Sequence, residues 1–224
     1  MAIGLYALMW LGYAENWAWL ARVDAWVLEP MDRVGAAHPG WVTAWNFFCT
    51  VLGPNAFRLV VLVVIVVALV RRHVRIAMFL FITVELSGVV NEIAKVLVDR
   101  PRPATAMVWA YGTSFPSGHA MGAMVAVLAL LTVVLPVVRA SRRGWLIAIG
   151  IGLVVGIGVG RVALNVHHPS DVIAGWALGY AYFVACVLML PPRGRPSRSR
   201  IAQREAQDPI THRDETPAVP DSAR

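Results

Sequence analysis

The apolar run Leu59–Val70 constrains the fold of this chain more than any other feature. Its residues are all Val, Leu, Ile or Ala, and the basic stretch Arg71–Arg75 closes it. Together with the residues from Pro54 onward, this segment is the clearest candidate for a membrane-crossing helix. The whole chain is 58% hydrophobic and only 15% charged, which is too apolar for an ordinary soluble domain. The sequence therefore predicts an integral membrane protein.

The other apolar segments predict the remaining spans of the bundle. We expect an all-α, polytopic membrane helical bundle with about six transmembrane helices and one interfacial amphipathic segment. The first segment is short for a ~30 Å hydrocarbon core at ~1.5 Å per residue, so it spans the membrane only if the helix continues through Glu15. In chain order the predicted spans are Met1–Tyr13, Phe57–Val70, Ile76–Ala94, Ala120–Val138, Trp145–Gly160 and Val172–Leu190.

Two further regions differ from the spans in composition. Residues Trp17–Trp45 mix tryptophans with Arg22, Asp24 and Glu29, which is the chemistry of an aromatic belt, so we expect this region along the membrane interface. Residues 191–224 are charged, rich in Pro and Ser and nearly free of large apolar side chains. This composition predicts a disordered tail after one membrane-embedded domain at residues 1–190.

The basic clusters set the predicted sidedness of the bundle. Arg71–Arg75, Arg139–Arg143 and Arg193–Arg200 alternate along the spans so that they fall on one face, which the positive-inside rule makes cytoplasmic. The net charge of +7 therefore reflects topology, and nucleic acid is not an expected partner. We expect a multi-pass protein of the cell membrane with a cytoplasmic tail.

Three polar stretches remain for the opposite, extracytoplasmic face. They are Lys95–Pro103, Ser114–His119 and Arg161–Asp171, and a six-span bundle brings them together at its outer surface. In the second stretch, Ser117 can cap the helix that follows, and Gly118 lets the backbone approach a ligand closely. The free N–H groups and positive dipole end of such a helix suit an anion.

Together these stretches carry side chains suited to phosphoryl transfer. Arginine and lysine match the equatorial oxygens of a phosphoryl group and stabilise the charge that develops during transfer. One histidine can attack phosphorus and the other can protonate the leaving oxygen, while the carboxylate at position 171 can orient the nucleophilic ring. The residues concerned are Lys95, Arg102, Arg161, His119, His167 and Asp171.

These motifs resemble those of the type 2 phosphatidic acid phosphatases, which share their site with vanadium haloperoxidases. The first is Lys95 followed after six residues by Arg102-Pro103, and the second is Pro116-Ser117-Gly118-His119. The third is Arg161, five residues, His167, three residues and Asp171. One departure is Gly160, where the family often has Ser; loss of that hydroxyl bears on substrate preference more than on the reaction. The short first span is another.

The resemblance implies a metal-independent membrane phosphatase with a phosphohistidine intermediate, no cofactor and no obligate protein partner. It assigns His167 as nucleophile with Asp171 assisting, and His119 as general acid. It assigns the substrate phosphate to Lys95, Arg102, Arg161, Ser117 and the Gly118 amide. The implied substrate is a lipid phosphomonoester or diphosphate, of the polyprenyl diphosphate or phosphatidic acid type.

Rival functions remain at this stage. A phosphotransferase that passes the group to another acceptor would use the same residues. The membrane spans disfavour a haloperoxidase, and an anion transporter has no need of the spacing between His167 and Asp171. Two neighbours of the motifs also stay open: Arg100 lies outside the motif spacing, and His168 is better placed to begin a helix before Pro169 than to react.

Overall fold

The computed structural model describes residues 1–192, and within that range it contains only helices and loops. The prediction of a disordered tail concerns residues outside this range, except for Pro191 and Pro192. The helices are α1 (Ala2–Ala14), α2 (Ala18–Ala37), α3 (Pro39–Val51), α4 (Pro54–Val70), α5 (Val74–Leu80), the π-helical segment η1 (Phe81–Glu85), α6 (Ser87–Val98), α7 (Gly118–Val134), α8 (Ala140–Ala163) and α9 (Pro169–Met189).

Four continuous helical stretches are long and apolar enough to cross a membrane. They are Pro39–Val70, Val74–Val98, Ala140–Ala163 and Pro169–Met189, while α1 and α7 are apolar but shorter. This arrangement confirms the predicted all-α membrane bundle. The number of helices that cross the bilayer stays a prediction.

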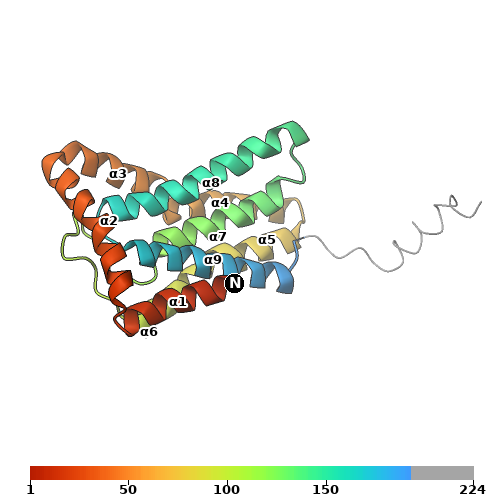
Figure 1. Cartoon of the computed structure of the whole chain (residues 1–224). Coiled ribbons are helices and arrows are strands. Elements are labelled where there is room, and N and C mark those ends of the chain that lie inside the picture. Colours follow the sequence, from red (N-terminus) through yellow and green to blue (C-terminus); the bar gives the residue numbers. More distant parts are fainter. Residues whose placement is uncertain (193–224) are drawn as a thin grey trace, which may run out of the picture. The chain divides into compact units, whose positions relative to one another are not determined.

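Helix α7 lies at the centre of the bundle. It contacts α4, α6, α8 and α9, and Figure 1 shows α8, α7, α9 and α1 side by side in that order. Its small side chains Ala120, Ala123, Ala126 and Ala129 are fully buried, which lets neighbouring helices approach closely. On the α9 side of this contact lies Gly175, where an added Cβ would be 2.6 Å from the Ser117 carbonyl oxygen. Close packing of α7 and α9 therefore fixes the start of both helices.

The two ends of the bundle differ in the residues they carry. Figure 1 shows the loops before α7 and between α8 and α9 at one end, together with α2. The turn between α4 and α5 and the start of α8, which hold the basic clusters Arg71–Arg75 and Arg139–Arg143, lie at the opposite end. The three polar stretches and these clusters are therefore separated as the sequence predicts.

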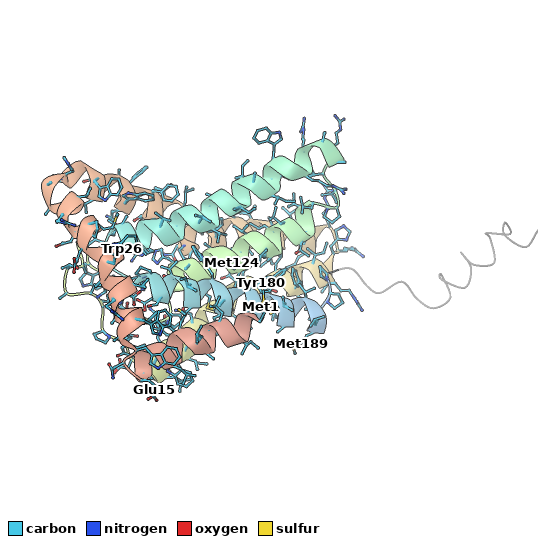
Figure 2. All side chains as sticks on the ribbon, in the orientation of Figure 1. Met1, Glu15, Trp26, Met124, Tyr180 and Met189 are labelled. Atoms are coloured by element: carbon cyan, nitrogen blue, oxygen red, sulfur yellow. The ribbon has the colours of Figure 1, made fainter. Side chains whose placement is uncertain are left out.

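The predicted interfacial region Trp17–Trp45 divides into two helices with different roles. Helix α2 exposes Trp19 and Trp26, the latter 76% accessible, and Figure 2 shows Trp26 and Met189 toward opposite ends of the bundle. Helix α3 instead packs on α8, and it continues almost directly into α4. Trp41 and Trp45 therefore belong to a different helix from the α2 tryptophans, and the interfacial position of this region stays a prediction.

Two predicted helix boundaries also move. Helix α7 ends at Val134 rather than Val138, because Pro136 has no N–H with which to continue the helical hydrogen bonds. Helix α8 begins at Ala140 rather than Trp145, so Arg142 and Arg143 belong to its first turn. Charged residues at the end of a span can continue the helix beyond the apolar run that reveals it.

Candidate active site

The three polar stretches meet at one cavity of about 620 Å³. The motif residues come from the last turns of α6 and α8, the first turn of α7 and the loops that follow α6 and α8, while α3 and α4 complete the lining. The predicted site residues that line it are Lys95, Arg102, Gly118, His119, Arg161 and His167.

Ser117 and Asp171 lie behind this cavity instead of lining it. Both side chains are fully buried. The Ser117 hydroxyl accepts a hydrogen bond from the Ala120 N–H at 3.5 Å, which makes it the N-cap of α7. The Ser117 N–H donates to the Asp171 carbonyl oxygen at 3.0 Å. Ser117 therefore joins the starts of α7 and α9, and the adjacent Gly118 and His119 face the cavity.

His167 presents its Nε2 atom to the cation of Arg102. The ring is 2% exposed, and Nε2 lies 3.2 Å from Nη1 of Arg102. A guanidinium can only donate, so Nε2 accepts and the ring proton of the neutral histidine sits on Nδ1. That nitrogen faces the Ser114 hydroxyl at 3.5 Å and the Asp171 Oδ2 at 3.7 Å. The lone pair on Nε2 is the one a phosphorus atom in the cavity would meet.

The Asp171 carboxylate is held by several donors at once. Its Oδ1 accepts from Arg100 Nη1 at 2.7 Å, and its Oδ2 accepts from the Ser114 hydroxyl and from the His168 N–H at 2.8 Å. His168 is the N-cap of α9, with Pro169 in the first turn, as the sequence indicates. The carboxylate thus caps α9 as well as facing His167.

Burial controls the charge of His167. It lowers the pKa of His167 to about 4, against the opposing effect of the Asp171 carboxylate; Arg161 and Arg102 lower that pKa further. His167 is therefore neutral at pH 7, which is the form that can donate a lone pair.

Arg102 is fixed by backbone carbonyl groups rather than by a carboxylate. It donates to the carbonyl oxygens of Tyr111 at 2.7 Å, Gly112 at 3.0 Å and Val166 at 2.7 Å. These bonds connect the loop before α7 to the loop after α8. They leave the charge of Arg102 without an anionic partner among residues 1–192.

The other two cations of the cavity are also nearly free of anions. Arg161 is 6% exposed, its Nε has no hydrogen-bond partner, and no carboxylate of the described chain lies within 4.0 Å of it. Lys95 lies 3.6 Å from Glu92, whose side chain is 62% exposed. Three cations, of which Lys95 and Arg161 are buried, with one partly solvated partner make a site that favours a multiply charged anion.

Comparison with known proteins identifies the family. The PAP2 superfamily model matches residues 76–195, more than half of the chain. The chain belongs to the PAP2 superfamily. The motif resemblance is thereby confirmed.

Several curated proteins are similar over part of their length. Phosphatidylglycerophosphatase B of Bacillus subtilis is 36% identical over 97 residues, which is 42% of this chain and 47% of that protein. Lipid A 1-phosphatase of Rhizobium johnstonii is 32% identical over 145 residues, 55% of either chain. Undecaprenyl-diphosphatase of Sulfolobus acidocaldarius is 30% identical over 116 residues, 49% of this chain and 52% of that protein. The chain spans about half the length of these relatives.

A solved structure shares the fold. The crystal structure of a transmembrane PAP2-type phosphatidylglycerolphosphate phosphatase from Bacillus subtilis aligns with a TM-score of 0.73 at 20% identity. The alignment covers 87% of this chain and 98% of that one.

Gly160, the departure from the common PAP2 pattern, has a packing reason. A Cβ atom at this position would lie 2.5 Å from Cys49 Sγ and 2.8 Å from the Trp45 ring. Both contacts come from α3, which rests on this part of α8. A serine at position 160 would therefore collide with α3 before its hydroxyl could serve a phosphate.

Sequence reasoning missed four polar residues around this PAP2 site. Asp24, Ser114 and Ser170 are buried, and Arg100, whose role the motifs left open, is 7% exposed and paired with two carboxylates rather than facing the cavity. For Asp24 a signal existed: it lies one turn from Leu20 and from Leu28, on the apolar face of α2. A carboxylate in the middle of such a face requires a buried partner.

Proposed function

We propose that this PAP2 chain is an integral membrane phosphatase that hydrolyses a lipid phosphomonoester or diphosphate through a phosphohistidine on His167. One observation carries the proposal: a neutral His167, whose Nε2 accepts from Arg102, lines a cavity that also holds three cations with little anionic compensation. The similarity to three named lipid phosphatases supports the same reaction class.

A groove beside the cavity supports a lipid as the substrate. It has a volume of about 680 Å³ and shares Arg58, Gly88 and Glu92 with the polar cavity. The rest of its lining is mostly apolar and comes from the outward face of α6: Val89, Ile93, Val96 and Leu97. A phosphate in the cavity can therefore stay attached to a hydrocarbon chain that lies against α6.

The proposed reaction has two steps. Nε2 of His167 attacks phosphorus, the bond to the leaving oxygen breaks, and His119 gives that oxygen a proton. His119 takes up this proton when the anionic substrate enters, because burial and the cavity cations otherwise hold the pKa of His119 far below its ordinary value. Lys95, Arg102 and Arg161, with the Gly118 N–H, stabilise the charge on the three equatorial oxygens. Water then attacks the phosphohistidine, with its proton passing to His119, and inorganic phosphate leaves. Ser117 contributes to phosphate binding indirectly, because it fixes the start of α7 and so places the Gly118 N–H and His119.

We further propose that the site faces the outer side of the membrane and needs no metal ion. The three cations occupy the place that a divalent ion takes in other phosphoryl-transfer sites. Within residues 1–192 no group of three or more His, Cys, Asp or Glu side chains is arranged to hold a metal.

The test is phosphate release by the purified protein in detergent. We expect inorganic phosphate from at least one of undecaprenyl diphosphate, phosphatidic acid and phosphatidylglycerol phosphate, without any acceptor and in the presence of EDTA, with inhibition by vanadate. Turnover only with an added lipid or sugar acceptor, with the phosphoryl group found on the acceptor and no inorganic phosphate released, would identify a phosphotransferase instead. Complete loss with EDTA and recovery with magnesium would contradict the metal-independent reaction.

A further inference from the structure

Asp24 is a buried carboxylate that the reaction described above does not use. It lies in the middle of α2 between Leu20 and Leu28, and the three side chains are 2%, 4% and 8% exposed respectively. Burial of a carboxylate is strongly unfavourable unless it is paired and fully hydrogen-bonded. The contacts of Asp24 therefore show what α2 holds in place.

All three hydrogen bonds that the Asp24 carboxylate accepts come from two residues beside the catalytic groups. Its Oδ2 accepts from Arg100 Nη2 at 2.9 Å and from the Ser170 hydroxyl at 2.6 Å. Its Oδ1 accepts from the Ser170 N–H at 3.0 Å. Ser170 directly precedes Asp171 in the first turn of α9, so Asp24 holds the backbone next to the catalytic carboxylate.

Arg100 divides its guanidinium between two carboxylates. Nη2 serves Asp24, whereas Nη1 donates to Asp171 Oδ1 and to the Ser170 hydroxyl, both at 2.7 Å. The ring of Tyr13 in α1 lies against the same guanidinium, 4.8 Å from its central carbon. Because Asp24 takes one nitrogen, Asp171 receives a single-point contact on one oxygen only. Its other oxygen is left facing Ser114 and His167.

Removal of the Asp24 charge would change this geometry. A guanidinium with one carboxylate partner prefers a two-point contact that uses both oxygens. Arg100 would then compete for the Asp171 oxygen that faces His167. Helix α2 also holds the loop before α9 at a second point, since the Leu28 carbonyl oxygen accepts from Asn165 Nδ2 at 3.2 Å.

We propose that Asp24 is a positioning residue for catalysis: from α2 it holds Arg100 and Ser170 so that Arg100 binds only Oδ1 of Asp171, and Oδ2, held by Ser114 and His168, stays facing His167. The inference rests on the proposed phosphatase function and adds a residue outside the three motifs. Asp24 touches neither the cavity nor a substrate.

The experiment compares Asp24→Asn with Glu29→Gln, which changes an exposed carboxylate of the same helix. The readouts are kcat, KM, and the inhibition constants of vanadate and of inorganic phosphate, with folding checked by thermal unfolding in detergent. Vanadate reports the five-coordinate state that needs an oriented His167, whereas phosphate reports only the cations. We expect Asp24→Asn to lower kcat about 10- to 100-fold and to raise the inhibition constant of vanadate by a similar factor. This is the size of effect expected when a residue that orients a catalytic group is lost. KM and the phosphate constant should change less than about twofold, and Glu29→Gln should resemble the wild type.

Two further variants separate positioning from damage to the fold. If Asp24→Asn does not fold, Ser170→Ala removes two of the same contacts with little change in volume and should show the same pattern more weakly. In an Arg100→Gln background, Asp24→Asn should lower kcat by a smaller factor than in the wild type, because only its contacts with Ser170 remain to be lost. Wild-type kcat in folded Asp24→Asn, or a lower kcat with unchanged vanadate inhibition, would overturn the inference. If His167→Ala also stayed active, the proposed function itself would fail.

Discussion

At the scale of single residues, the two cavity histidines differ in their surroundings, and the proposed mechanism gives them different roles for that reason. His167 is held through Nδ1 by Ser114 and Asp171 and points Nε2 at Arg102. His119 stands in the first turn of α7 and lines the same cavity without a hydrogen-bond partner among the described side chains. One imidazole is oriented for attack, and the other is free to approach a leaving oxygen.

This difference predicts a substrate-dependent effect of His119→Ala. Without the acid, a lipid phosphate with an alkoxide leaving group should lose at least about 100-fold in kcat/KM, since positioned general acids contribute 10²–10⁴-fold. An aryl phosphate needs little protonation of its leaving group and should keep most of its rate. The check is kcat/KM for both substrates on folded protein. An equal loss on both would remove His119 from the role of acid.

Burial of neutral His167 predicts a pH dependence of stability. The pKa of His167 is about 4 in the folded protein and ~6.5 in an unfolded chain, so the unfolded state binds the extra proton first. The stabilising contribution of the neutral ring is present above pH ~6.5 and is lost as the pH falls toward about 4. Between pH 7 and 5 the wild type should lose up to about 2 kcal/mol more than His167→Gln. Thermal unfolding of both proteins in detergent measures this; parallel curves would contradict the assigned charge state.

At the scale of helices, the packing of α3 limits the size of the side chain that α8 can have at position 160. It brings Cys49 and Trp45 against Gly160, whereas nothing lies within 4 Å of a Cβ built at Gly152 two turns earlier. Gly160→Ser should therefore cost about 1–3 kcal/mol through overpacking and reduce activity, because the adjacent Arg161 must move. Gly152→Ser is the matched control. It should leave the free energy of unfolding unchanged and kcat within about twofold of the wild type. If Gly160→Ser had the same free energy of unfolding as the wild type, α3 would be shown to move aside at little cost.

The helices also show what the sequence could and could not predict. Apolar runs such as Leu59–Val70 were sufficient to predict the helices of the bundle, because such residues are stable only when they are removed from water, whereas the number of spans stays a prediction. The packing of α3 against α8 could not be predicted, because the polar and aromatic residues of α3 resemble those of a membrane interface. Residues of the three motifs could be placed at one end from span order alone. The partners of Asp24 and Ser114 could not be predicted, because these contacts join elements far apart in the chain.

At the scale of the whole molecule, the arrangement of basic clusters predicts the orientation of the site. Thr105 lies in the loop that borders the catalytic end, and Ser197 lies in the tail beyond the described residues. A membrane-impermeant maleimide should label a cysteine at position 105 in intact cells and not one at 197. The two native cysteines are buried and give little background. The reverse labelling pattern would move the site to the inner face.

The central claim is that His167 forms a covalent bond to phosphorus, and trapping of the phosphorylated protein tests it most directly. With a lipid substrate labelled in its terminal phosphate, the quenched wild-type protein should carry label that is stable to alkali and lost in acid, as expected for a phosphoramidate. His168→Ala should still be labelled and keep most of its kcat, since His168 serves as the cap of α9. His167→Ala should carry no label and lose several orders of magnitude in turnover. Label on the folded His167→Ala protein, or turnover near the wild-type rate, would contradict the account.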